Sequence, residues 1–141
     1  MIRLAFFDSK EYDVQSFKSV VDTNKYCIKY FDVRLNEDTV KLAQGFDAII
    51  AFVNDSLSDN VIKTLASYGI KAVFLRCAGF NNVDIKYAED KIAIVRVPAY
   101  SPEAVAEHAV ALLMTSVRRI HKAYNRTRDY NFSLSGLTGM D

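Results

Sequence analysis

The chain has 141 residues, of which 50% are hydrophobic and 25% charged, so it is long and apolar enough to build one globular core. Its formal net charge of +1 leaves no overall field that would attract nucleic acid or an anionic membrane, and no apolar run approaches the length that spans a bilayer. Cys27 and Cys77 are too few for a disulfide scaffold and lack metal-site spacing, and the N-terminus lacks the apolar segment of a signal peptide, which together predict a cytoplasmic protein.

Short runs of β-branched and aromatic residues alternate with segments of helical spacing along the first hundred residues. The runs cover residues 2–7, 27–33, 48–53, 72–75 and 92–97, and the helical segments cover residues 12–21, 39–44, 61–66 and 84–89. The runs are almost continuously hydrophobic, which is typical of strands covered on both faces. Strands that alternate with helices require right-handed crossovers and a parallel sheet. The sequence therefore predicts an α/β fold with a flavodoxin-like five-stranded parallel sheet.

Residues that commonly begin or end helices stand at the expected boundaries. Gly45 and Gly69 follow the second and third helical segments, and Asp84 precedes the fourth as a candidate cap. After the last strand, Ser101 and Pro102 predict a new helix, with Ser101 as its N-cap and Pro102 as its first residue.

This new helix differs in character from the earlier ones. Between residues 104 and 114 only Glu107 and His108 are polar. A helix that is apolar on nearly all sides has to be buried on most of them, so we expect it to need a partner beyond one small sheet domain.

The remainder of the chain is first basic and then polar. Residues 118–128 carry five basic side chains and no acidic one, and residues 132–141 have the Ser, Gly and Thr content of an extended arm. The sequence therefore predicts a substrate-binding domain over residues 1–100. A hinge, a long helix over residues 102–125 and the arm would make up residues 101–141.

Two loops are candidates for a ligand site, because ligands of open parallel sheets bind at the carboxyl ends of the strands. In the loop over residues 76–84, a positive φ at Gly79 would let the N–H groups of Ala78 and Gly79 converge on a carboxylate. In the loop over residues 98–102, the hydroxyl of Tyr100 could reach the same anion. Judged by chemistry alone, a plain strand-to-helix turn and a rigid connector whose tyrosine only packs remain open as alternatives.

Three stretches together resemble the NAD-dependent D-2-hydroxyacid dehydrogenases, and among these the fermentative D-lactate dehydrogenases. They read RCAGFNNVD over residues 76–84, VPAYSPEAVAEHA over residues 97–109 and RRIHKAYNRTRDYNFSLSGLTG over residues 118–139. The resemblance implies that backbone amides of Ala78 and Gly79 hold the carboxylate of a 2-oxoacid and that Tyr100 assists them. It also implies that Phe52 lines the substrate pocket and favours a small substrate such as pyruvate.

The same resemblance implies an activity and partners. The family's lactate dehydrogenases reduce pyruvate with NADH to D-lactate, and the helix over residues 102–125 would pair two subunits in a homodimer. The five glycines of this chain cannot form the dinucleotide fingerprint G-x-G-x-x-G. The family's NAD-binding domain, its catalytic arginine, its histidine acid and the acidic partner correspond to positions beyond Asp141. We therefore expect a front part of such an enzyme that has no catalytic residue, binds no cofactor and is inactive by itself.

Other titratable residues are weaker candidates. His108 and His121 lie on the long helix rather than at the sheet edge, so we expect neither to act as the proton donor. Cys77 borders the anion loop, where an inert buried thiol is favoured over a reactive one.

Two other classes of protein fit parts of the sequence. A phospho-receiver signalling domain would need an acidic cluster after the first strand, an acceptor such as Asp55 near the third and a lysine after the fifth. Here Asp8 has no adjacent acid, and Pro98 begins the segment where that lysine would lie. A nucleic-acid-binding module would use the basic residues 118–128, but the acidic balance elsewhere argues against it.

Overall fold

The computed structural model describes residues 1–140, and Asp141, the last residue of the predicted arm, lies outside them. The chain divides into two units, Met1–Pro98 and Ala99–Asp141. Each unit has its own set of elements.

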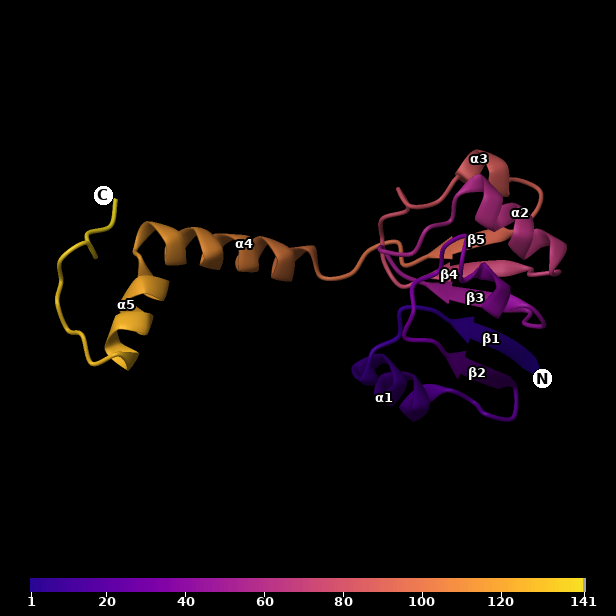
Figure 1. Cartoon of the computed structure of the whole chain (residues 1–141), viewed down its shortest axis with the longest axis horizontal. Helices are drawn as coiled ribbons and strands as arrows, with labels where there is room; N and C mark the ends of the chain where they lie inside the picture. Colours follow the sequence, from indigo (N-terminus) through magenta and orange to yellow (C-terminus); the bar gives the residue numbers. More distant parts are fainter. Residues whose placement is uncertain (141) are drawn as a thin grey trace. The chain divides into compact units, whose positions relative to one another are not determined.

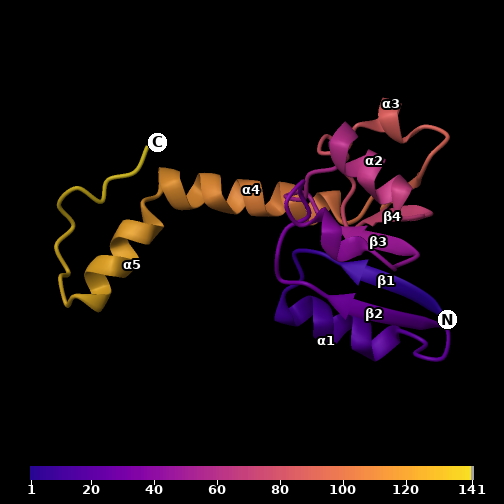
Figure 2. The same ribbon diagram turned by 45° about the vertical axis from the view of Figure 1, so that its right-hand side comes forward.

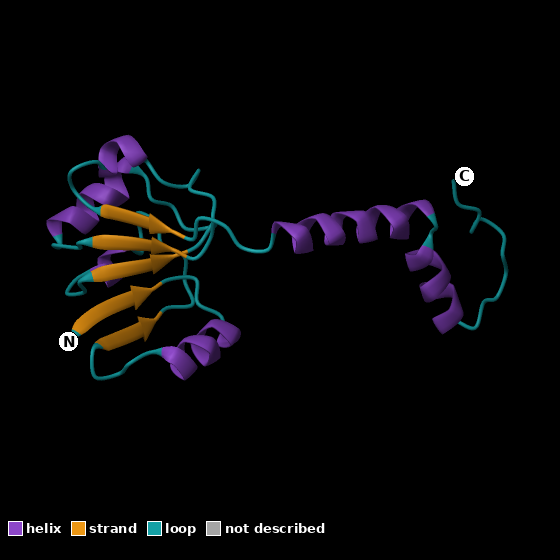
Figure 3. Ribbon diagram, turned by 180° about the vertical axis from the view of Figure 1, so that it is seen from behind, coloured by secondary structure: helices purple, strands orange, loops and turns teal. Residues whose placement is uncertain are grey.

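A five-stranded sheet forms the centre of the first unit (Figure 1). Its strands are β1 (Ile2–Phe6), β2 (Tyr26–Tyr30), β3 (Ala48–Ala51), β4 (Ala72–Leu75) and β5 (Ala93–Arg96). They lie in the order β2-β1-β3-β4-β5, and all pairs are parallel, so the arrows in Figure 3 point the same way. The predicted flavodoxin-like sheet is confirmed. Most strands are shorter than the hydrophobic runs because the last residues of those runs already belong to the loops at the carboxyl edge.

The connections between strands are short helices. They are α1 (Glu11–Val20), the 3-10 helix η1 (Val40–Ala43), α2 (Asp59–Ser67) and α3 (Ile85–Ala88). Asp84 caps α3 as predicted, since its side chain accepts a hydrogen bond from the Tyr87 N–H. Gly45 and Gly69 follow η1 and α2 with φ values of +82° and +80°, in the left-handed region that suits a glycine at a helix end.

The two faces of the sheet are covered differently. Because side chains alternate along a strand, Phe7, Ile49 and Val73 share one face, where they form the main core with buried residues of η1 and α2. On the opposite face, Phe6 packs edge-on against Phe17 of α1, with 5.0 Å between the ring centroids.

The prediction that every strand is covered on both faces is wrong for β2, none of whose residues is buried, and for the last two strands. All four residues of β3 are buried, but Phe74 of β4 is 41% exposed and Val95 of β5 is 45% exposed. These two side chains lie on the face that carries α1, and α1 packs over Phe6 of β1. Within residues 1–98, no helix therefore shields this part of the face from solvent.

The second unit contains two helices rather than one. The predicted helix over residues 102–125 is interrupted, and α4 (Pro102–Val117) and α5 (Ile120–Arg128) are joined by a bend (Figure 2). Arg119 lies in the bend with φ +54°, a left-handed conformation that cannot continue an α-helix. Pro102 is the first residue of α4, as predicted, but Ser101 makes no side-chain cap hydrogen bond. None of the helices within residues 1–140 combines the length and apolar character that crossing a bilayer requires.

The arm after α5 folds back toward the bend between the two helices (Figures 1 and 2). The Met140 N–H donates to the Val117 carbonyl at 3.3 Å, and a Cβ on Gly139 would lie only 2.7 Å from that same oxygen. Arg119 Nε donates to the Thr138 carbonyl at 2.6 Å, and Arg126 donates to the Ser133 carbonyl at 3.2 Å. Basic side chains of this segment therefore bind the carbonyls of the arm, which gives no support to a nucleic-acid module.

Candidate functional site

The carboxyl ends of β3 and β4 bring Phe52 and the candidate loop over residues 76–84 together. Ala51 pairs with Leu75 in the sheet register, so Phe52 and Arg76 follow directly and lie side by side. The Arg76 guanidinium carbon is 4.5 Å from the centroid of the Phe52 ring. The predicted pocket residue Phe52 thus lies next to the start of the predicted anion loop.

The two predicted donors of the anion loop are unused. Within residues 1–140, no backbone or side-chain acceptor is hydrogen-bonded to the N–H groups of Ala78 or Gly79. The Ala78 carbonyl accepts a hydrogen bond from Arg96 Nη1 at 2.9 Å. Since the C=O and N–H of one peptide point in opposite directions, this bond turns the Gly79 N–H away from Arg96. Free, fixed backbone donors are what a carboxylate ligand requires.

The expected positive φ at Gly79 is wrong. Gly79 is not among the glycines with a left-handed backbone, which are Gly45, Gly69 and Gly136. A Cβ at Gly79 would meet no atom of the protein within 4 Å. Neither backbone strain nor packing within the chain therefore requires a glycine here, and the open space beside its Cα is available to a ligand.

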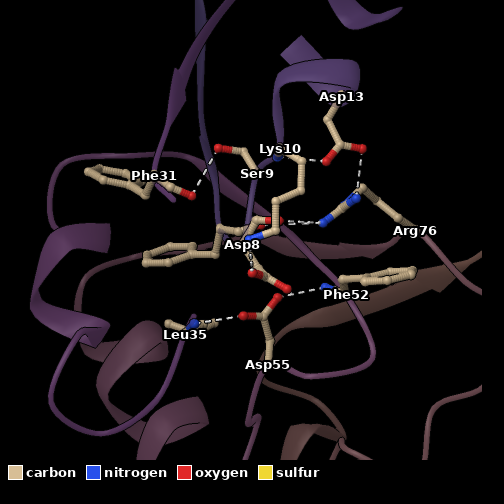
Figure 4. Close-up of polar contacts among 10 residues, drawn as sticks. Asp8, Ser9, Lys10, Asp13, Phe31, Leu35, Phe52, Asp55 and Arg76 are labelled. Atoms are coloured by element: carbon tan, nitrogen blue, oxygen red, sulfur yellow. Dashed lines mark hydrogen bonds and ion pairs between the residues drawn. The ribbon is translucent and has the colours of Figure 1, made fainter. Parts of the chain in front are cut away.

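Asp55 fixes the backbone at Phe52 through a hydrogen bond to the Phe52 N–H (Figure 4). Its carboxylate is 1% exposed and accepts hydrogen bonds from the N–H groups of Leu35 and Phe52, each at 2.6 Å. Burial raises the pKa of Asp55, and these two backbone donors oppose the rise. Asn82 adds a hydrogen bond from Nδ2 to the Phe52 carbonyl at 3.0 Å. Asp55 is thus a buried structural acceptor, which gives no support to a phospho-acceptor role.

Arg76 is a buried cation that sequence reasoning did not single out. Its side chain is 12% exposed, and its Nη1 pairs with Asp13 Oδ1 of α1 at 2.9 Å. Its Nη2 donates to the Asp8 carbonyl at 3.2 Å, while the Asp8 side chain pairs with Lys10 at 2.8 Å (Figure 4). A buried charge needs such partners, but they come from distant parts of the chain, so no local sequence signal reveals them.

A groove runs along the exposed face of the sheet and reaches this edge. It has a volume of about 1210 Å³. Phe52 and Arg76 border it at the carboxyl ends of the strands, and Phe74 and Val95 border it over the sheet. The groove is therefore apolar over the sheet, with Asp47 and Lys71 at the amino ends of the strands and Arg76 at the carboxyl ends.

The remaining predicted residues belong to the second unit. Tyr100 belongs to the second unit and is 62% exposed, so its convergence with Ala78 and Gly79 stays a prediction. His108 and His121 are exposed residues of α4 and α5.

The two thiols should react at very different rates with an aromatic disulfide reagent at mildly alkaline pH. Cys27 is exposed, whereas Cys77 is buried and its Sγ donates to the Gly79 carbonyl at 3.3 Å. Burial raises the pKa of Cys77, and since the thiolate is the nucleophile, we expect it to react at least about tenfold more slowly than Cys27. Absorbance of the released thiol should show two phases, and Cys27→Ser should remove the fast one. Equal rates would contradict the placement of Cys77.

Comparisons with known proteins indicate one protein family. The family model for the D-isomer specific 2-hydroxyacid dehydrogenase catalytic domain matches residues 4–135. The D-lactate dehydrogenase of Escherichia coli is 50% identical over 139 residues, which make up 98% of this chain and 42% of that protein.

Solved structures show the same partial coverage. The apo-structure of D-lactate dehydrogenase from Escherichia coli has a TM-score of 0.87 at 49% identity, over 99% of this chain and 44% of that one. The D-lactate dehydrogenase of Aquifex aeolicus, complexed with NAD and lactic acid, has a TM-score of 0.75 at 25% identity, over 98% of this chain and 41% of that one. The chain spans less than half the length of these relatives. It belongs to the family of D-isomer specific 2-hydroxyacid dehydrogenases.

Proposed function

We propose that this chain is the substrate-binding part of an NAD-dependent D-lactate dehydrogenase, which reduces pyruvate to D-lactate. The observation that carries the proposal is the pair of unbonded N–H groups at Ala78 and Gly79, at the carboxyl edge of a sheet that matches the Escherichia coli enzyme. Residues 1–100 would form the substrate-binding domain, and residues 101–141 would form the hinge, the two helices and the arm. A signalling or nucleic-acid role has no comparable support.

Each site residue has a distinct part in holding the substrate. The N–H groups of Ala78 and Gly79 bind the carboxylate of pyruvate, and Arg96 holds the Ala78–Gly79 peptide, which carries the Gly79 N–H, in the required orientation. The Tyr100 hydroxyl donates to the same carboxylate. The Phe52 ring limits the room for the side chain of the substrate, so that a methyl group fits better than a longer chain.

The NAD of the complete enzyme would be held outside these residues. NAD and lactic acid are bound in the Aquifex aeolicus protein. In this chain, Gly79 is the one glycine between a strand and the following helix, and Gly45 and Gly69 follow helix ends instead. The residues described here therefore do not fit a dinucleotide fingerprint, and no step of catalysis is assigned to them. Both cysteines are free, which suits a reducing cytoplasm as the proposed location.

A fusion enzyme tests the proposal. It joins residues 1–141 to the part of Escherichia coli D-lactate dehydrogenase that follows the matched segment. The fusion should consume NADH with pyruvate and form the D isomer, whereas the 141-residue chain should leave the absorbance of NADH unchanged. A folded fusion that binds NADH but does not turn over pyruvate would refute the proposal. Turnover by the 141-residue chain, purified free of host enzyme, would refute the expected inactivity.

The apolar surface of α4 supports a homodimer. No residue of α4 is buried, and the exposed fractions of Val105 and Leu113 are 62% and 59%. Several apolar side chains left in water form a patch that favours association, and a two-fold contact is the simplest closed arrangement. We propose that α4 contributes to this contact, with α5 and the arm beside it.

Substituting Val110 with glutamate should weaken the proposed dimer. Val110 is 57% exposed in α4, and a charge buried in an apolar contact without a partner is strongly unfavourable. Light scattering coupled to size exclusion should report about twice the 15.9 kDa chain mass for the unmodified protein and a lower mass or aggregates for Val110→Glu. His108→Glu, which adds the same charge at a polar position of α4, serves as the matched control. A 15.9 kDa species in all three proteins would contradict the dimer.

A further inference from the structure

The Arg76 guanidinium lies between two aromatic rings at the carboxyl edge of the sheet. Its central carbon is 4.6 Å from the centroid of the Phe6 ring and 4.5 Å from that of the Phe52 ring. Phe6 lies on the face of the sheet that carries α1, and Phe52 and Arg76 follow directly after the paired ends of β3 and β4. A planar guanidinium stacks on aromatic faces in a way that the compact ammonium of a lysine cannot reproduce.

The guanidinium itself is held in place from α1 and β1. Asp13 Oδ1 accepts from its Nη1 at 2.9 Å, and the carbonyls of Phe7 and Asp8 accept from its Nη2 at 3.5 Å and 3.2 Å (Figure 4). Asp13 also accepts a hydrogen bond from the Lys10 N–H at 2.9 Å, so its own position is fixed at the start of α1. The guanidinium is therefore held in a fixed position, and the Phe52 ring packs against it.

The backbone of Phe52 is fixed independently of its ring. Asp55 accepts the Phe52 N–H at 2.6 Å, and Asn82 donates to the Phe52 carbonyl at 3.0 Å. With the main chain held, the orientation of the ring depends on what its faces contact. The ring is only partly buried, and it packs on the core cluster on one side while Arg76 occupies another.

We propose that Arg76 is a positioning residue that sets the orientation of the Phe52 ring and thereby the size of the 2-oxoacid that the enzyme accepts. This inference rests on the proposed function, in which Phe52 lines the substrate pocket. Arg76 does not touch the substrate. It keeps the Phe52 ring in an orientation that admits pyruvate and excludes a 2-oxoacid with a longer side chain. When the contact with Arg76 is lost, the ring rotates and the substrate pocket becomes larger.

The test compares two substrates in the fusion enzyme. Arg76→Lys keeps a positive charge that can pair with Asp13 but removes the flat stacking surface. The ratio of kcat/KM for pyruvate to kcat/KM for 2-oxoisocaproate should fall by about threefold to tenfold, as expected for a desolvated cation–π contact. Asp13→Asn, which removes the anion that holds the guanidinium, should change the ratio in the same direction and by less.

Two further variants separate positioning from a general structural role. Arg3→Lys alters another arginine–aromatic contact, at 5.1 Å from the Phe46 ring, and should leave the ratio unchanged. In a Phe52→Ala background the ring is absent, so Arg76→Lys should have no further effect on the ratio. A substitution that only destabilised the protein would lower kcat/KM for both substrates alike, and it would do so equally with and without the Phe52 ring.

The outcomes distinguish the inference from the function on which it rests. If Phe52→Ala changes the ratio and both Arg76→Lys and Asp13→Asn leave it unaltered, the positioning role is refuted and the pocket assignment stands. An equal effect of Arg76→Lys with and without the Phe52 ring would also refute it. If Phe52→Ala itself leaves the ratio unaltered, the assignment of Phe52 to the substrate pocket fails.

Discussion

Replacing Gly79 with valine in the fusion enzyme should raise the Michaelis constant for pyruvate by about tenfold to a hundredfold, the loss expected for one hydrogen bond to a charged group. The valine side chain would fill the open space beside the Gly79 Cα, where no protein atom lies within 4 Å. A carboxylate could then no longer approach the N–H groups of Ala78 and Gly79 closely.

This substitution is a clean test because the protein itself does not need a glycine at the site. The backbone of Gly79 is not left-handed, so valine introduces no strain, and the thermal unfolding temperature should change little. The Michaelis constant for NADH should also stay constant. Tyr100→Phe should raise the constant for pyruvate more mildly, because it removes only an assisting hydroxyl. Unaltered constants in both variants would place the carboxylate elsewhere.

Replacing Asp55 with alanine should lower the free energy of unfolding by about 2 to 6 kcal/mol, because each of two buried N–H groups that lose their acceptor costs about 1 to 3 kcal/mol. Those groups belong to Leu35 and Phe52, and both hydrogen bonds are 2.6 Å long. A loss of this size is a large fraction of the stability of an ordinary domain.

Denaturant unfolding of the 141-residue chain at one protein concentration measures the effect. Asp55→Asn retains one acceptor oxygen, so its free energy of unfolding should lie between that of the unmodified protein and that of Asp55→Ala. Asp38→Ala removes a carboxylate from an exposed position and should change the free energy of unfolding by less than about 0.5 kcal/mol. Similar values for Asp55→Ala and Asp38→Ala would mean that the buried carboxylate does not organise the backbone at Phe52.

The second unit shows where local patterns mislead. An apolar stretch followed by a basic one predicts a single helix, and helix propensity offers no reason to stop at Arg118. The stop depends on the left-handed backbone of Arg119 and on the arm, whose Met140 bonds back to Val117. Contacts between residues more than twenty positions apart therefore decide where α4 ends. Periodicity within a short window carries no information about them.

The anion loop shows what a local pattern can and cannot tell. Its place at the carboxyl end of a parallel strand follows from the alternation of strands and helices, and the free donors of Ala78 and Gly79 lie where the sequence predicts them. The backbone conformation differs from the expected one, because Arg96 on the neighbouring strand orients the Ala78 carbonyl without a left-handed residue. A glycine in a sequence shows that a side chain is absent. The sequence does not show whether the glycine is needed for a positive φ or for the space that a side chain would fill.

The sequence by itself determined the α/β class, the parallel sheet, the family and the loop that presents free N–H groups, because hydrophobic periodicity and short motifs are local properties. Only the tertiary structure decided that one face of β4 and β5 is exposed, that Asp55 supports Phe52, and that the Arg76 guanidinium lies over the Phe52 ring. Arg76 and its partner Asp13 are 63 positions apart in the chain. The physical reason is that a buried charge is tolerated only where distant segments bring its counter-charge and acceptors together, and that encounter exists only in the folded chain.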